Sequence, residues 1–292
     1  MRNPRKIRLT LKSRPTVEGA GVRLKRAFAY VDEYLDPFLL LDDFHSNNPD
    51  DYIAGFPWHP HRGIETITYM LHGRLEHGDS MGNGGIIRSG DVQWMTAGSG
   101  IIHQEMPKFN EDDPTLWGFQ LWANLPRSHK MMEPRYRGVN AEDIPEVVLG
   151  EDEVKIKLIA GEIQGRKGPV QDVLTEPEYL DVSMIPHARF EHAISKGHNV
   201  LAYIIEGRGY FDERKEESIG KERLVIFKDG ESISIRTQGE RLRFLLISGK
   251  PLKEPVAWRG PIVMNTEREL EIAFKEYREV TFIKHQEPLV DD

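Results

Sequence analysis

Two short stretches, His59-Pro60-His61 and His103-Gln104-Glu105, contain the residues of this chain that are best suited to chemistry. In each stretch the ionisable side chains stand two residues apart, a spacing that puts both on one face of a β-strand. Pro60 excludes a helix interior at the first stretch. If the two strands face each other, three imidazoles and one carboxylate can bind one divalent transition metal. Coordination positions then remain for a substrate or O₂.

Glu65 would share a strand face with His59 and His61 if one strand ran through this region. Because the four residues above already suffice as ligands, we expect Glu65 to orient a ligand imidazole from behind it. Gly63 lies between them and can break the alternation. Single histidines are expected to have structural, hydrogen-bonded roles, and this applies to His72, His77, His129, His187, His192, His198 and His285.

The elements that must position these residues are predicted to be short strands. Turn residues interrupt the sequence at close intervals, as in Asn83-Gly84-Gly85 and Gly98-Ser99-Gly100. Such regular spacing predicts hairpins in an all-β sandwich or barrel. Helical periodicity occurs only near the end of the chain. There Thr266 and Glu269 form a capping box, followed at helical spacing by Leu270, Ala273, Phe274 and Tyr277. We therefore expect an all-β protein with one C-terminal helix.

A change of composition at residues 127–153, which are rich in proline and acidic residues, predicts the connection between two domains. An internal repeat supports this division, because residues 67–74 resemble residues 201–208, and residues 88–91 resemble residues 228–231. Under these offsets the four candidate ligands correspond to Ala193, Ser195, Arg243 and Leu245. The second domain is therefore predicted to lack metal ligands.

The composition is that of an acidic globular protein without cysteine. Its 292 residues include 39 Lys and Arg against 47 Asp and Glu, a formal charge of −8. This charge excludes a general nucleic-acid binder, since phosphate neutralisation needs a basic surface. Without cysteine, any metal must use nitrogen and oxygen ligands. The apolar runs are too short to span a bilayer and no secretory signal is recognisable, so we expect a cytoplasmic location. The basic first fourteen residues are expected to form a solvated edge strand or arm.

Residues 56–66 resemble the first cupin motif in the form found in the pirin family, and residues 90–107 resemble the second. Residues 36–44 and 260–266 are also similar to pirin sequences, so the resemblance extends over most of the chain. Carried over to this sequence, the family's metal ligands are His59, His61, His103 and Glu105. Fe(II) is the metal that the family suggests, while the ligand set by itself also admits Mn, Co, Ni or Cu.

The same resemblance implies a bicupin fold, with two jelly-roll barrels that face each other. The implied domains are a metal-binding N-terminal cupin over residues 1–134 and a C-terminal cupin over residues 135–292 that lacks metal ligands. Pirins include proteins with quercetin 2,3-dioxygenase activity and others described as transcriptional or metabolic co-regulators. The family therefore implies two different functions for one fold.

The first implied function is an iron-dependent dioxygenase that opens the ring of a flavonol-like enol or a catechol with O₂. Glu105 is then a candidate base for the hydroxyl proton of the substrate, and Phe56 is a candidate for the pocket wall. The alternative is a non-enzymatic regulator that binds a transcription factor or a metabolic enzyme and holds a structural or redox-sensing metal. A metal-dependent sugar isomerase is a third reading. It would need a basic phosphate-binding set, for which Arg62 and Arg74 are the candidates.

Overall fold

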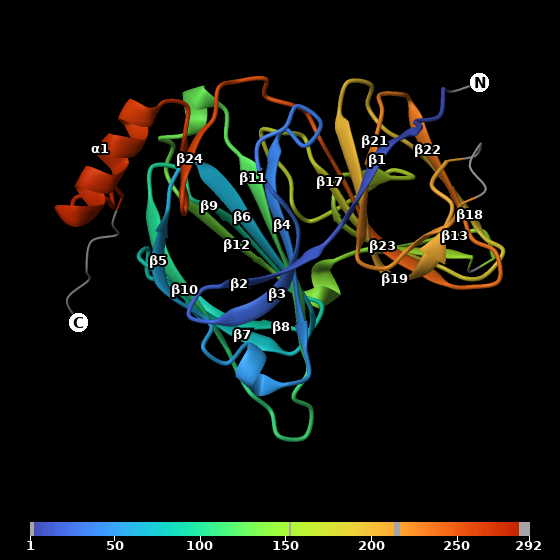
Figure 1. Cartoon of the computed structure of the whole chain (residues 1–292), viewed down its shortest axis with the longest axis horizontal. Coiled ribbons are helices and arrows are strands. Elements are labelled where there is room, and N and C mark those ends of the chain that lie inside the picture. The colour runs from blue at the N-terminus through green and yellow to red at the C-terminus, as the bar shows by residue number, and fades with distance from the viewer. Residues whose placement is uncertain (1–2, 152, 213–216, 286–292) are drawn as a thin grey trace. The chain divides into compact units, whose positions relative to one another are not determined.

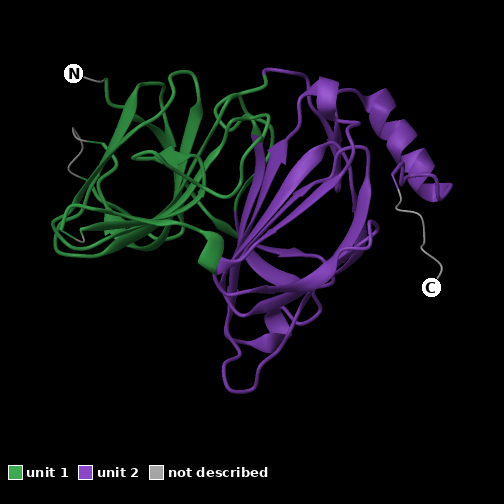
Figure 2. Ribbon diagram, turned by 180° about the vertical axis from the view of Figure 1, so that it is seen from behind, with its two compact units in different colours: residues 1–14, 27–37, 142–252 green, residues 15–26, 38–141, 253–292 purple. Residues whose placement is uncertain are grey.

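The computed structural model describes residues 3–151, 153–212 and 217–285, and β-strands dominate it (Figure 1). The chain divides into two compact units, which are coloured separately in Figure 2. Unit 1 comprises Met1–Arg14, Ala27–Pro37 and Glu142–Leu252. Unit 2 comprises Pro15–Arg26, Phe38–Ala141 and Lys253–Asp292. Each unit has an apolar core of its own.

Unit 2 contains two large antiparallel sheets. One sheet has the order β5 (Phe56–His61), β10 (Ile101–Pro107), β7 (Arg74–Asp79) and β8 (Gly84–Arg88). The other has the order β12 (Arg135–Val139), β9 (Val92–Thr96), β6 (Ile64–His72), β11 (Leu116–Asn124), β4 (Phe38–Ser46), β3 (Val22–Ala29) and β2 (Arg14–Glu18). The hairpin predicted at Asn83-Gly84-Gly85 is present as β7 and β8, whereas Gly98-Ser99-Gly100 forms no hairpin, because it connects β9 to β10 in the other sheet.

The alternation of side chains along each strand gives unit 2 an interior. In β10, Ile101, His103 and Glu105 are buried, while the residues between them are partly exposed. One apolar cluster of the interior comprises Val22, Leu24, Phe44, Tyr52, Met70, Leu75, Ile87 and Leu116. Another comprises Leu39, Ile64, Met95, Ala97, Ile101 and Val263. Buried polar residues on β5 and β10 therefore share the interior with hydrocarbon.

Unit 1 has one large antiparallel sheet and two small ones. The large sheet has the order β1 (Ile7–Lys12), β21 (Arg223–Phe227), β19 (Asn199–Gly209), β23 (Leu242–Gly249), β17 (Glu178–Met184), β14 (Val154–Ala160) and β13 (Glu146–Leu149), and β20 (Ile219–Gly220) pairs with β19. The small sheets are β18 (Arg189–Ala193) with β22 (Ser232–Arg236), and β15 (Glu162–Ile163) with β16 (Arg166–Lys167). The basic stretch at the N-terminus contributes β1 at the sheet edge, as expected, but its Arg5 is buried and not solvated.

Strand pairing shows which elements of the two units correspond. β18 pairs with β22 in unit 1 as β5 pairs with β10 in unit 2, so the counterpart of the His103 strand is β22. The predicted correspondence of His103 and Glu105 with Arg243 and Leu245 is therefore wrong, because those two residues lie on β23, which pairs with β17 and β19. The buried residues of β18 and β22 are Phe190, Ile233 and Ile235. They belong to the apolar core of unit 1, so hydrocarbon fills these positions.

After β23 the chain continues into unit 2. β24 (Ala257–Arg259) pairs with β25 (Ile262–Met264), and α1 (Glu267–Arg278) contacts both strands. The predicted capping box is confirmed, because the Thr266 side chain accepts from the Glu269 amide and the Glu269 carboxylate accepts from the Thr266 amide. Short 3₁₀ helices also occur, at Pro49–Asp51, Arg127–His129 and Ala141–Asp143. Across the described ranges, no helix is both long and apolar enough to cross a bilayer.

The two units differ from the contiguous halves predicted at residues 1–134 and 135–292. β1 pairs with β21 in unit 1, whereas the segment from Lys253 onwards joins unit 2. The predicted connection at 127–153 also contributes a strand to unit 2, because β12 pairs with β9. The change in composition predicted the boundary in the middle of the chain. It could not predict that the N-terminal segment joins unit 1 and the C-terminal segment joins unit 2, because pairing between distant segments leaves no local sequence pattern.

Candidate metal centre

Three histidines from two neighbouring strands meet inside unit 2. The register of β5 and β10 places His103 opposite His59 and Ile101 opposite His61. His59, His61 and His103 each offer a ring nitrogen, and these ligand atoms all lie within 4.8 Å of one another. The structure therefore brings together three of the four ligands that strand spacing predicts.

Backbone carbonyls orient the two imidazoles on β5. The Nδ1 atom of His59 lies 2.7 Å from the carbonyl oxygen of Pro57, and the Nδ1 atom of His61 lies 3.0 Å from that of Pro261. Because a carbonyl can only accept, each Nδ1 carries the proton and each Nε2 presents a lone pair. The two Nε2 atoms are 3.1 Å apart. Burial, with a contribution from His59, lowers the pKa of His61 to about 3, so its ring is neutral at physiological pH.

His103 completes a donor set that fits a divalent cation. Neither of its ring nitrogens has a hydrogen-bond partner among the described residues, although the side chain is buried. Burial lowers the pKa of His103 well below the usual value, so this ring is also neutral. An unpaired buried polar group costs about 1–3 kcal/mol. Two nitrogens bound at right angles to a metal at about 2.1 Å would be about 3 Å apart, close to the observed separation of the His59 and His61 Nε2 atoms.

Glu105 follows His103 on the same interior face, and its carboxylate belongs to a polar network. The hydroxyl of Thr68 donates to Glu105 Oε1 at 2.7 Å, and Nε2 of Gln93 donates to the same oxygen at 3.2 Å. Thr68 and Gln93 are directly opposite each other on β6 and β9, so both project from one face of that sheet. These bonds orient the carboxylate. Its role as a fourth metal ligand stays a prediction.

Glu65 lies on the other face of that sheet. It is opposite Thr96 on β9 and accepts a hydrogen bond from the Thr96 hydroxyl at 2.7 Å. Glu65 is three residues from Thr68 on β6, and Thr96 is three residues from Gln93 on β9. Because side chains alternate between the two faces of a sheet, Glu65 and Thr96 point away from Glu105. The reason is Gly63, which has a φ of +76° and separates β5 from β6, two strands of different sheets. The expected strand face shared with the β5 histidines ends at this turn, and the structure does not bring Glu65 to the imidazoles.

Aromatic residues lie beside the ligands. Phe56 is opposite Glu105 in the strand register and packs against the apolar cluster that contains Tyr52. Its role in substrate contact stays a prediction. Trp122 lies edge-on to His61, with ring centroids 5.0 Å apart. Phe56 and Trp122 are each only partly buried, whereas His61 is buried. The site therefore has aromatic surface next to its polar groups.

A histidine, an aspartate and a tyrosine near the site were not identified from the sequence as functional residues. On β7, His77 is opposite Glu105 and Asp79 is opposite His103. The His77 ring bonds Asp79 through Nε2 at 3.2 Å, stacks on Tyr136 and lies 5.6 Å from the His103 ring. Burial, with contributions from Asp79 and Glu105, raises the pKa of Tyr136 to about 12, so the phenol keeps its proton. The i, i+2 spacing of His77 and Asp79, which puts both on one strand face, could have identified this pair from the sequence. No sequence pattern connects Tyr136 of β12 with them.

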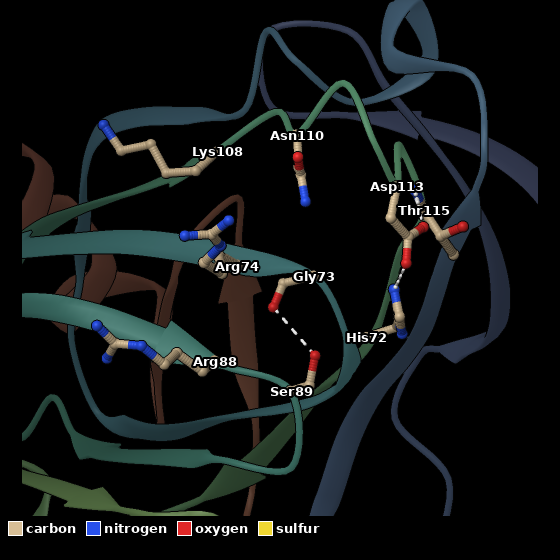
Figure 3. A pocket seen from close by; sticks show the side chains of 9 residues that line it. All are labelled: His72, Gly73, Arg74, Arg88, Ser89, Lys108, Asn110, Asp113 and Thr115. Atoms are coloured by element: carbon tan, nitrogen blue, oxygen red, sulfur yellow. Dashed lines mark hydrogen bonds and ion pairs between the residues drawn. The ribbon is translucent and has the colours of Figure 1, made fainter.

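A separate polar cavity of about 300 Å³ opens elsewhere on unit 2 (Figure 3). Its lining residues are His72, Gly73, Arg74, Arg88, Ser89, Lys108, Asn110, Asp113 and Thr115. Arg74 is exposed and alternates along β7 with the buried His77, so it faces away from the histidines. Arg62 is buried and bonds the carbonyl of Ser99, the carboxylate of Glu276 and the carbonyl of Phe282. Arg62 and Arg74 therefore do not form the phosphate-binding set that a sugar isomerase would need.

Comparison with known proteins gives a consistent result. The family model described as Pirin matches residues 21–123, and the one described as Pirin C-terminal cupin domain matches residues 179–283. A Pseudomonas aeruginosa protein provisionally named quercetin 2,3-dioxygenase is 42% identical over 91% of this chain and 93% of its own length. Pirin of Rattus norvegicus is 39% identical over 95% of this chain and 94% of its own. The solved structure of quercetin 2,3-dioxygenase from Acinetobacter baumannii has a TM-score of 0.88 and 32% identity, over 96% of this chain and 98% of that one. The prediction of two cupin domains is confirmed.

Proposed function

The chain belongs to the pirin family, and on this premise we propose that it is a metal-dependent dioxygenase of the quercetin 2,3-dioxygenase type. The proposal rests mainly on the group of three converging imidazoles, of which His61 and His103 are buried and His103 has no hydrogen-bond partner in the described part of the chain. A site with few protein ligands leaves positions for a reacting molecule, whereas structural sites tend to be closed. The similarity to proteins named quercetin 2,3-dioxygenase supports the same activity.

In this proposal His59, His61 and His103 hold the metal, and Glu105 is the fourth ligand. The first three are supported by the convergence of their ring nitrogens, and the fourth by its place on the His103 face of β10. Fe(II) is the metal that the family resemblance suggests, and when bound it supplies Lewis acidity and electron transfer to O₂.

Glu105 is also the group to which we assign the hydroxyl proton of the substrate. Hydrogen bonds from Thr68 and Gln93 orient its carboxylate before any substrate is present. We infer a flavonol-like enol or a catechol as the substrate class, because such molecules combine an acidic hydroxyl with an electron-rich ring. Phe56 beside Glu105 and Trp122 beside His61 offer aromatic surface to a planar ligand.

The overall reaction proposed from the family resemblance consumes one O₂ for each substrate molecule. For a flavonol, both oxygen atoms enter the product in new C–O bonds, the ring opens, and one ring carbon leaves as CO. The substrate itself supplies the electrons that reduce O₂, so no external reductant is needed. A cytoplasmic location belongs to this proposal, since a chain without cysteine suits a reducing compartment.

Oxygen uptake by iron-loaded protein with quercetin tests the proposal. His59→Ala should lose both bound iron and oxygen uptake. His72→Ala is the matched control, because His72 is a partly exposed histidine of unit 2 that pairs with Asp113 in the separate cavity. Equal rates for the wild-type protein and His59→Ala would remove the metal from the reaction.

The second candidate function is a regulator that binds a transcription factor or a metabolic enzyme. The family resemblance includes such proteins, and this reading is supported by unit 1, where the strands that correspond to β5 and β10 contribute Phe190, Ile233 and Ile235 to an apolar core. This reading expects one stoichiometric protein partner, together with no oxygen uptake on flavonols or catechols. The combination of those two results would decide for the regulator.

A further inference from the structure

Residues 256–283, which we call the C-terminal strap, pack against the strands that carry the histidines. The strap contains β24, β25 and α1. Val263 of the strap packs in one apolar cluster with Ile101, and Phe282 packs in another with Ile102. Ile101 and Ile102 begin the strand that continues to His103. The last segment of the chain therefore covers the start of β10.

One strap atom contacts a site histidine directly. The carbonyl oxygen of Pro261 accepts a hydrogen bond from Nδ1 of His61 at 3.0 Å. This bond holds the ring in the tautomer that leaves Nε2 free for a metal. The attachment continues along the strap, where the Val263 amide donates to the Arg62 carbonyl at 3.1 Å. The orientation of His61 therefore depends on where the strap lies.

Arg62, the residue after His61, binds the strap with its side chain. It is only 1% exposed. Its Nη1 donates to Glu276 at 2.7 Å, its Nη2 donates to the Phe282 carbonyl at 2.8 Å, and the guanidinium lies over the Phe282 ring. Glu276 lies on α1, so a carboxylate of this helix neutralises a buried cation adjacent to a site histidine. Losing one partner of such a pair is costly, because the other charge stays buried.

Lys130 fixes the other side of the same turn. Its buried Nζ donates to the carbonyl oxygens of Gly63 and Val263 at 2.8 and 3.0 Å, and to the Asn124 side chain at 2.6 Å. The strap approaches this turn so closely that a Cβ on Gly63 would lie 2.0 Å from the Val263 oxygen. The turn after His61 is therefore held between Lys130 and the strap.

We propose that docking of the C-terminal strap raises the affinity of the site for its metal. Glu276 is then a positioning residue that acts through Arg62 on His61. The inference depends on the metal site proposed above. Because coupling between two equilibria is reciprocal, the docked strap orients His61 for the metal, and the bound metal stabilises the docked strap. Groups that support metal ligands in this way typically change metal affinity by about 10–100-fold.

Two glutamates of α1 provide a matched test. Glu276→Gln removes the charge opposite buried Arg62, whereas Glu267→Gln removes the charge opposite exposed Arg259, and both pairs have the same N–O distance of 2.7 Å. The probe is Co²⁺, which the ligand set admits, and its affinity for the full chain is measured by competition with a chelator. We expect the affinity to fall at least about 10-fold in Glu276→Gln and less than about 2-fold in Glu267→Gln. Glu276→Asp, which keeps the charge, should recover part of the loss. A wild-type affinity in folded Glu276→Gln overturns the proposal and leaves the metal site in place.

Hydrogen exchange of the wild-type protein tests the coupling from the other side and needs no variant to fold. Co²⁺ should slow exchange of the α1 amides by about 10-fold, the change implied by a 10-fold coupling. The amides of β1 in unit 1 are the control and should not change. If Co²⁺ binds and exchange in α1 stays the same, the strap is not coupled to the metal. If the wild-type protein binds no Co²⁺, the proposed metal site itself fails, which distinguishes the two failures.

Discussion

We expect His103 to lower the stability of the metal-free protein although metal binding requires it. The side chain is buried, and both ring nitrogens lack a partner within the described residues. A buried polar group without a partner costs about 1–3 kcal/mol, and leucine fills a similar volume without polar atoms. In the metal-free protein we therefore expect His103→Leu to raise the free energy of unfolding by about 1–3 kcal/mol. The same change should abolish Co²⁺ binding.

His77→Leu is the matched control for this prediction. The two histidines share the interior of unit 2, with rings 5.6 Å apart, and both are at most 2% exposed. Like His103, His77 has a buried Nδ1 without a partner among the described residues, but it differs because its Nε2 bonds the buried carboxylate of Asp79 at 3.2 Å, and a bond to a charged group outweighs one unpaired nitrogen. Leucine at this position removes that bond and should cost about 1–3 kcal/mol. The same substitution at two neighbouring sites should therefore change stability in opposite directions.

Urea unfolding in the presence of EDTA measures both effects. Tryptophan fluorescence reports on unit 2 alone, because that unit contains Trp58, Trp94, Trp117, Trp122 and Trp258. Excess Co²⁺ should reverse the order of stability, since a ligand at 1,000 times its Kd stabilises the wild-type protein by about 4 kcal/mol and His103→Leu gains nothing. A metal-free His103→Leu protein less stable than the wild-type protein would refute the reasoning, because His103 would then have stabilising interactions without a metal.

Three further predictions concern the same unit. Gly63→Ala should cost about 3 kcal/mol or more, because φ is +76° and the new Cβ would lie 2.0 Å from the Val263 oxygen; an unchanged melting temperature would contradict this. Thr68→Val removes a hydrogen bond to the Glu105 carboxylate and should cost about 1.5–3 kcal/mol in urea unfolding, whereas a wild-type midpoint would show that this bond contributes nothing. In metal-free protein the pKa of His61 is about 3, against about 6.5 in the unfolded chain, so the unfolded chain binds more protons as the pH falls below 6.5. The free energy of unfolding should therefore fall by about 2 kcal/mol between pH 6.5 and 5 through this residue, and His61→Leu should lack that slope; parallel pH curves for the two proteins would disprove it.

The histidine cluster could be predicted because its pattern is local. On a strand the spacing of His59 and His61 fixes a common face, and the structure brings His103 to it from the neighbouring strand. The helix at the C-terminus was equally accessible, since the capping residues Thr266 and Glu269 are close in sequence. In both cases the interacting groups lie within a few residues or on regular, alternating strands.

The remaining features depend on geometry that no short stretch of sequence contains. The carbonyl that orients His61 comes from Pro261, 200 residues away, and a carbonyl has no residue-type signature. The predicted strand face shared by Glu65, His59 and His61 was wrong, because Gly63 has a positive φ and ends the strand alternation between them. The repeat was misaligned beyond β19, because residues 88–91 form the turn before β9, whereas residues 228–231 form the turn before β22, the counterpart of β10.

The exchange of terminal segments between the units has a consequence for biosynthesis. The strands that carry the histidines leave the ribosome early, but the strap that covers them, residues 256–283, follows only after the whole of Glu142–Leu252 has been translated. At about 5–20 residues per second this delay is about 6–22 seconds. During that interval the nascent barrel exposes apolar surface that Val263 and Phe282 later cover. Cellular factors that shield hydrophobic nascent chains should therefore act on this protein before its last residues are made.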